Sequence, residues 1–210
     1  MKENILLVSQ IKKLKALRKN YPRKIRASAV NQVWGIDMTK VMIPAYGWLY
    51  LIVALDWYTK KIVGWHISES ARTTQWLAAL NRAVLTQFPD GIREHGQLCL
   101  LSDNGSQPTS EKFMKEAAAL GIKQIFASYD NPKGNADTER VLRTLKEDLV
   151  WPKEWTCPYA FREELAVWIN RYNQDYPHSA LAYMTPVEFE RKAIKQVPLT
   201  EGLNSTLIYA

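Results

Sequence analysis

The clearest β-strand signal in the chain lies at residues 32–42, which read QVWGIDMTKVM. Every second side chain of a strand points to the same face, so Trp34, Ile36 and Met38 are expected to line one face together. Asp37 then lies on the opposite face. A carboxylate in an interior strand is costly unless it is paired, hydrogen-bonded or bound to a metal ion, and a salt bridge is the simplest explanation for an isolated one.

Outward from this strand, the sequence predicts an α/β fold. Apolar segments at 48–55 and 62–67 are rich in β-formers and complete a three-stranded meander with residues 32–42. The other expected elements are a helix around 76–84, a strand at 98–101, a helix at 109–120, a strand at 122–127 and helices at 136–150 and 159–175. This order predicts a mixed five-stranded sheet with helices on both faces, followed by an irregular tail of some twenty residues.

Charge divides the chain into a basic arm and a nearly neutral remainder. The 210 residues carry a net charge of +7, and residues 1–30 hold nine Lys or Arg against Glu3 alone, a net +8 that leaves −1 for the other 180. Such an arm suits a polyanion, because each phosphate that it neutralises releases counterions, although a solvated tail is an equal alternative. We therefore expect an arm at 1–30, a core at 31–190 and a tail at 191–210.

Composition argues for a reduced, water-soluble protein. The cysteines and histidines, Cys99, Cys157, His66, His95 and His178, follow neither a zinc spacing nor a disulfide framework. The opening residues contain only a four-residue apolar run, so neither a signal peptide nor a membrane span is expected. We expect a cytoplasmic protein.

A second acid, Asp103, follows the strand expected at 98–101. Functional sites of α/β sheets gather at the carboxyl ends of strands, which is where Asp103 falls. The sequence Asp103-Asn104-Gly105 is equally typical of a tight turn in which the aspartate only caps the backbone. Position alone leaves both interpretations open.

A third acid, Glu139, begins the helix expected at 136–150. At about 100° per residue, Lys146 lies within about 20° of Glu139 around the helix and Arg143 about 40° away. One face of the helix would therefore carry a carboxylate and two cations. A weak surface ladder of ion pairs is the alternative.

Taken together, the three acids indicate a metal site, which none of them indicates alone. Divalent cations such as Mg²⁺ prefer carboxylate oxygens, and phosphoryl transfer often uses two ions about 4 Å apart. Asp37 would bridge both ions, Asp103 would complete one and Glu139 the other. Lys146 and Arg143 would face DNA phosphates.

Four blocks of sequence carry a family resemblance. They are residues 34–39 (WGIDMT), Asp56 with 62–65 (IVGW), 102–107 (SDNGSQ) and 131–139 (NPKGNADTE), and a fifth block joins 172–173 to 177–186. Thirty-five residues separate Asp103 from Glu139, and Lys146 follows Glu139 by seven. In order and spacing these blocks resemble the retroviral-integrase superfamily, and within it the catalytic domains of bacterial insertion-sequence transposases.

The resemblance covers about residues 30–190 and implies a ribonuclease-H-like fold. It implies a DDE-type transposase or integrase that cuts mobile-element ends and transfers strands with two Mg²⁺ or Mn²⁺ ions, held by Asp37, Asp103 and Glu139. It also implies a bacterial, nucleoid-associated protein that forms a homo-oligomer on DNA. The expected DNA contacts are Lys146, Arg143, Lys133 and the arm residues Lys12, Lys13, Arg23, Lys24 and Arg26.

Other interpretations remain open from the sequence. Relatives usually carry a longer helical DNA-binding region before the core, so this chain could be a shortened reading frame or could use a separate helix-turn-helix partner. The rival functions are a nuclease of the same fold and a non-catalytic DNA-binding remnant. Asp56 is interpreted as a hairpin residue and His178 as part of a structural turn, not a metal site.

Overall fold

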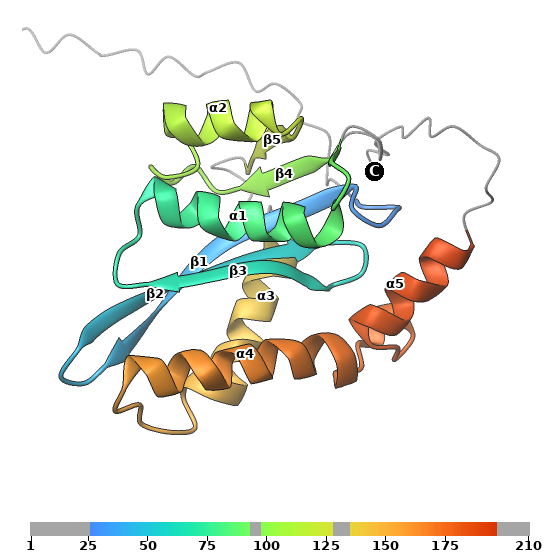
Figure 1. The fold of residues 1–210 in the computed structure, drawn as a ribbon. Coiled ribbons are helices and arrows are strands. Elements are labelled where there is room, and N and C mark those ends of the chain that lie inside the picture. The colour runs from blue at the N-terminus through green and yellow to red at the C-terminus, as the bar shows by residue number, and fades with distance from the viewer. Residues whose placement is uncertain (1–25, 93–97, 128–134, 197–210) are drawn as a thin grey trace, which may run out of the picture.

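A computed structural model describes residues 26–92, 98–127 and 135–196 of the chain. One mixed sheet forms its centre (Figure 1). Its strands are β1 (Val33–Ile43), β2 (Gly47–Asp56), β3 (Ile62–Ser68), β4 (Cys99–Ser102) and β5 (Lys123–Phe126). The order is β3-β2-β1-β4-β5; β1 pairs antiparallel with β2, β2 antiparallel with β3, and β4 parallel with both β1 and β5. The expected five-stranded mixed sheet is confirmed.

Helices cover both faces of this sheet (Figure 1). They are α1 (Thr73–Gln87), α2 (Glu111–Ala119), α3 (Ala136–Leu145), which continues as the π-helix η2 (Lys146–Val150), α4 (Pro158–Asp175), the short 3-10 helix η3 (Ser179–Leu181) and α5 (Pro186–Lys195). One hydrophobic core joins the sheet to α1 and α2, and the other joins it to α3 and α4. No helix in the described segments is both long and apolar enough to cross a membrane.

The alternation along β1 explains how one strand serves both cores. Trp34 and Ile36 are fully buried in the core beneath α1 and α2. Val33 and Val41 point the other way, into the core with α3 and α4. Asp37 shares this second face, because it is separated from Val33 and Val41 by an even number of residues. The strand therefore presents Asp37 toward the side of the sheet that α3 covers.

The expectation of an irregular tail is wrong for residues 191–195, which belong to α5. The helix begins at Pro186 after a capping box, in which the Thr185 hydroxyl accepts from the Glu188 backbone N–H and the Glu188 carboxylate accepts from the Thr185 N–H. The sequence Thr-Pro-Val-Glu carries this signal. Residues 197–210 lie outside the described part of the chain.

Candidate active site

Asp37 lies near the middle of β1. Its side chain is half-buried, and Oδ1 accepts a hydrogen bond of 2.8 Å from the backbone N–H of Met38. Burial raises the pKa of Asp37 to about 6 against the opposing effect of that hydrogen bond, and the carboxylates of Asp103 and Glu139 raise it further while Lys146 lowers it. Asp103, Glu139 and Lys146 therefore each lie close enough to Asp37 to influence its ionisation.

Sheet pairing explains why Asp103 lies beside Asp37. The parallel register between β1 and β4 matches Gly35 with Leu101, and the two aspartates come two residues further along their strands. Asp103 is exposed, and its Oδ1 accepts from the Gly105 backbone N–H at 3.0 Å. Asp103 is thus both the capping residue of a tight turn and a neighbour of Asp37, so the two interpretations of the sequence are compatible.

The turn after Asp103 is fixed by side chains on both sides. Asn104 Nδ2 donates to the carbonyl of Ala127, just beyond β5, at 2.6 Å. Gln107 Nε2 donates to the carbonyl of Ala71, just before α1, at 2.9 Å. Because these bonds anchor the turn to two elements, Asp103 occupies a defined place at the end of β4.

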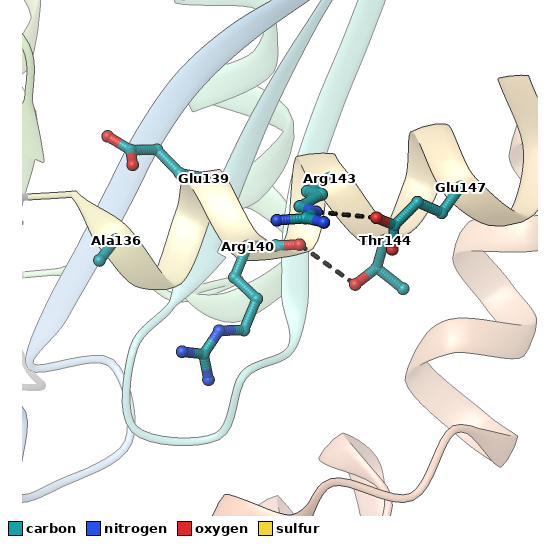
Figure 2. Close-up of a pocket in the computed structure, with 6 residues that line it drawn as sticks. All are labelled: Ala136, Glu139, Arg140, Arg143, Thr144 and Glu147. Atoms are coloured by element: carbon teal, nitrogen blue, oxygen red, sulfur yellow. Dashed lines mark hydrogen bonds and ion pairs between the residues drawn. The ribbon is translucent and has the colours of Figure 1, made fainter. Parts of the chain in front are cut away.

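Glu139 lies on the outer side of α3, in a pocket on the helix surface (Figure 2). Its side chain is exposed, and Figure 2 shows the Glu139 carboxylate and the Arg140 guanidinium pointing to different sides of the helix. Arg143 Nε forms an exposed ion pair of 2.7 Å with Glu147 Oε1. Of the two cations expected beside Glu139, Lys146 acts on Asp37, whereas Arg143 is engaged with Glu147.

Several residues that hold α3 in place had no role assigned from the sequence. Asn135 Nδ2 donates to the Ile36 carbonyl at 3.3 Å, and Trp57 Nε1 donates to Thr138 Oγ1 at 3.2 Å. Both bonds join the first turn of α3 to the β1–β2 pair. The blocks WGIDMT and NPKGNADTE contain Ile36, Asn135 and Thr138, so the resemblance marked this region without revealing the contacts.

The three acids are neighbours that are not gathered around one point. Within the segments that the structure describes, no three His, Cys, Asp or Glu side chains are grouped so that they could hold a metal ion together. Their donor chemistry nevertheless suits a hard divalent cation, because all three contribute carboxylates and two of them raise the pKa of Asp37. A bound cation would relieve this repulsion.

Of the remaining residues expected to contact DNA, only Arg26 lies in the part of the chain that the structure describes. Arg26 is exposed at the start of the described chain. The expected DNA contacts outside the described residues are Lys12, Lys13, Arg23, Lys24 and Lys133.

Asp56 and His178 are both structural, as expected. Asp56 is fully buried at the end of β2 and accepts backbone hydrogen bonds from Asn31 at 2.9 Å and Tyr58 at 2.8 Å. His178 precedes η3; its carbonyl accepts from the backbone N–H of Leu181 and its ring packs edge-on against Tyr172 at 5.1 Å. Burial lowers the pKa of His178, in keeping with a packed ring.

Comparisons with known proteins agree with this architecture. Two models described as integrase core domain match residues 27–132, just over half of the chain, and residues 120–186. A putative transposase for insertion sequence element IS986/IS6110 of Mycobacterium tuberculosis is 27% identical over 169 residues, which are 80% of this chain and 60% of that protein. The transposase for IS904 of Lactococcus lactis is 31% identical over 170 residues, 79% of this chain and 64% of that protein. The chain thus spans somewhat under two thirds of these relatives.

Solved structures agree on the fold. The simian T-cell lymphotropic virus intasome, in complex with a PP2A regulatory subunit, aligns with a TM-score of 0.64 at 16% identity over 88% of this chain and 61% of that one. The catalytic core domain of HTLV-2 integrase in complex with magnesium aligns with a TM-score of 0.59 at 17% identity over 79% of this chain and 99% of that one. The expected ribonuclease-H-like fold is confirmed.

Proposed function

Because the chain belongs to the integrase core domain family, we propose that it is the catalytic core of a DDE-type transposase that cuts and joins DNA at the ends of a mobile element. One observation carries the proposal: Asp103, just after β4, and Glu139 and Lys146, on the continuous helix α3–η2, all act on the pKa of Asp37 on β1. Three carboxylates beside one cation suit a reaction in which divalent metal ions and a DNA phosphate meet.

The three acids hold the metal ions in this proposal. Two Mg²⁺ or Mn²⁺ ions would activate the attacking oxygen and stabilise the leaving oxygen of a phosphodiester. Asp37, on β1 and half-buried, would hold the ions from the sheet. Asp103 and Glu139 have exposed side chains, which leaves them free to turn toward the ions. This difference in burial supports one rigid ligand and two adaptable ones.

Lys146 and Arg143 bind the DNA backbone in this proposal. Lys146 is close enough to Asp37 to lower the pKa of that carboxyl, and it would pair with a phosphate beside the reacting bond. The ion pair between Arg143 and Glu147 is exposed and therefore weak, so Arg143 can exchange its partner for a phosphate. Lys133, Arg26 and the arm residues Lys12, Lys13, Arg23 and Lys24 would extend the contact by charge.

We place this activity on DNA in the bacterial cytoplasm, in association with the nucleoid. Mobile-element ends and target DNA are the substrates, and paired active sites on two ends require a homo-oligomer. The relatives extend well beyond the matched length, and a separate helix-turn-helix protein could supply end recognition for this chain.

The test is nicking and joining of a plasmid that carries the DNA flanking the gene, with Mg²⁺ or Mn²⁺. We expect Glu139→Gln to lose more than about a hundredfold in cutting, because it removes a metal ligand. Glu147→Gln is the matched control: Glu147 lines the same surface pocket as Glu139, its carboxylate pairs with Arg143, and the variant should cut like the native chain.

Each outcome separates the alternatives. Joined products distinguish a transposase from a nuclease of the same fold, which would cut only. Equal cutting by the native chain and Glu139→Gln would contradict the assignment of the third acid. DNA binding without any metal-dependent cutting in the native chain would identify a non-catalytic remnant.

A further inference from the structure

The first turn of α3 packs closely against β1 at Gly35. A Cβ at this position would lie 2.1 Å from Thr138 Oγ1, 2.4 Å from Trp57 Nε1 and 2.8 Å from Asn135 Oδ1. Real Cβ atoms do not approach other atoms so closely, so the three polar groups occupy the space that glycine leaves. Gly35 also lies on the same face of β1 as Asp37, about 7 Å away along the strand.

The side chain of Asn135 does not cap α3, although asparagine at a helix start usually does so. Asn135 is the N-cap of α3, yet its side chain makes no capping hydrogen bond. The amide Nδ2 donates instead to the Ile36 carbonyl at 3.3 Å, directly before Asp37. Its Oδ1 is buried and has no hydrogen-bond partner among the described residues. Both features lower the stability of the helix start, and a capping serine would avoid both.

Thr138 provides the second attachment, one residue before Glu139. Its side chain is fully buried, and its Oγ1 accepts from the indole Nε1–H of Trp57, which is 7% exposed. Trp57 is in turn fixed by a 3.0 Å backbone hydrogen bond to the Val33 carbonyl. The start of α3 is thus attached to β1 directly through Asn135 and indirectly through Trp57.

We propose that Asn135, Thr138 and Trp57 are positioning residues that set Glu139 opposite Asp37 by locking the first turn of α3 onto Gly35. The inference rests on the proposed function, since it concerns how the two carboxylates come to share metal ions. Asp37 is part of β1 and is paired with Val53 of β2, so the distance between the two carboxylates depends on where α3 begins. A shift of about 1 Å in such an arrangement is enough to impair catalysis severely.

Thr138→Val tests the Trp57 attachment with little change in shape. We expect the indole N–H resonance of Trp57, assigned with Trp57→Phe in ¹⁵N-labelled chain, to move. The Mg²⁺ concentration that gives half-maximal cutting, and the concentration that half-saturates the Mg²⁺-dependent rise in Tm, should both increase about tenfold, as when a group that orients a ligand is removed. Thr138→Ser keeps the hydroxyl and should remain within about twofold of the native chain.

Thr144→Val is the matched control. Thr144 is also on α3, but its hydroxyl donates only to the Arg140 carbonyl of the same helix, at 3.1 Å. This variant should leave the Trp57 resonance and both Mg²⁺ midpoints unchanged.

Asn135→Ser separates positioning from stability, and it serves if Thr138→Val folds poorly. Serine is a good N-cap but cannot donate to the Ile36 carbonyl in the same way. We expect Tm without metal to stay equal or rise while both Mg²⁺ midpoints increase severalfold. A merely structural role for Asn135 would leave the midpoints unchanged.

The outcomes distinguish this inference from the proposed function. Native midpoints in Asn135→Ser, or in Thr138→Val with a shifted Trp57 resonance, would overturn the positioning role and leave the proposed function intact. A native chain with neither Mg²⁺-dependent cutting nor a Mg²⁺-dependent rise in Tm would overturn both.

Discussion

At the scale of single residues, two buried aspartates show how similar acidities arise from different surroundings. Burial raises the pKa of both Asp37 and Asp56 to about 6. The neighbours of Asp56 are mainly backbone N–H donors, which stabilise its charged form. The neighbours of Asp37 include two carboxylates, which oppose its ionisation. The carboxylate of Asp56 is therefore stabilised by the backbone of a turn, whereas that of Asp37 is repelled by its neighbours, a repulsion that a bound cation would relieve.

The raised pKa of Asp56 makes a prediction about stability and pH. Between its ordinary value of 3.8 and about 6, the native state holds the proton that the unfolded state has lost. The free energy of unfolding should therefore fall as pH rises through this window, by at most about 1.4 kcal/mol per pH unit for one group. Asp56→Asn should flatten this slope.

Urea unfolding at several values between pH 4 and pH 7 measures the effect. The variant should also be less stable throughout by roughly 1–3 kcal/mol, since an amide cannot accept both backbone hydrogen bonds through oxygen. Some slope should remain, because the pKa of Asp37 is shifted in the same direction. The exposed Asp90→Asn is the control, and a slope as steep in Asp56→Asn as in the control would refute the account.

At the scale of elements, the turn between β2 and β3 connects two helices through adjacent lysines. Lys60 Nζ lies 2.9 Å from Asp137 Oδ2 at the start of α3. Lys61 Nζ lies 2.6 Å from Glu190 Oε2 on α5. The lysine side chains are 19% and 18% exposed, so these pairs are more sheltered than an ordinary surface pair. The turn thus joins α3, which carries Glu139, to α5, whose residues 191–195 fall in the segment expected to be irregular.

Removing one member of the Lys61–Glu190 pair should loosen α5. Glu190→Gln leaves the Lys61 charge sheltered and without its partner, so we expect a loss of about 3 kcal/mol in the free energy of unfolding. Lys61→Met together with Glu190→Gln should lose less than the sum of the single changes. Urea unfolding of the four proteins measures this coupling.

An exposed ion pair on α2 is the comparison for the Lys61–Glu190 pair. Glu111 and Lys115 on α2 are separated by 2.7 Å but are 78% and 74% exposed. Glu111→Gln should therefore cost less than about 0.5 kcal/mol. If Glu190→Gln proved equally mild, the Lys61–Glu190 pair would have no special part in docking α5.

At the scale of the whole molecule, charge and chemistry are assigned to different parts of the chain. Nine of the 28 Lys and Arg residues lie in residues 1–30, whereas the three acids lie in the folded body. The sheet order brings β1 and β4 side by side and so joins Asp37 to Asp103 across more than sixty residues of sequence. If the proposed function is correct, changes in the arm should alter the attraction to DNA without altering metal binding by the three acids.

This division predicts how DNA affinity responds to salt. Lys12→Ala with Lys13→Ala should reduce the slope of log affinity against log salt by about 0.9 for each phosphate that the arm no longer neutralises. Cutting per bound DNA should change little, since the acids are untouched. Fluorescence anisotropy of labelled DNA measures the slope. The salt should be varied between about 50 and 200 mM, the range over which affinities that depend on phosphate contacts fall steeply. Lys115→Ala is the control; an unchanged slope in the arm variant would refute the role of the arm.

Local patterns in the sequence predict the five strands, the helices up to Asp175 and the candidate acids. Alternation along residues 32–42 placed Asp37 on the opposite face from Trp34 and Ile36, because side-chain direction in a strand depends only on its own backbone. The tight-turn sequence after the strand located Asp103, and helical spacing predicted that Lys146 shares a helix face with Glu139. The sequence also carries the capping box Thr185–Glu188, which is the local signal for the start of α5.

Contacts between distant segments depended on packing, which no local period encodes. The Gly35–Leu101 register joins Asp37 to Asp103, and the space left by Gly35 sets the start of α3. The choice between two possible partners is also decided by the folded structure. Arg143 lies four residues from both Glu139 and Glu147 along the helix, and it pairs with Glu147. Spacing along a chain states which side chains can meet, whereas burial and the choice among partners follow from the free energy of the whole packed structure.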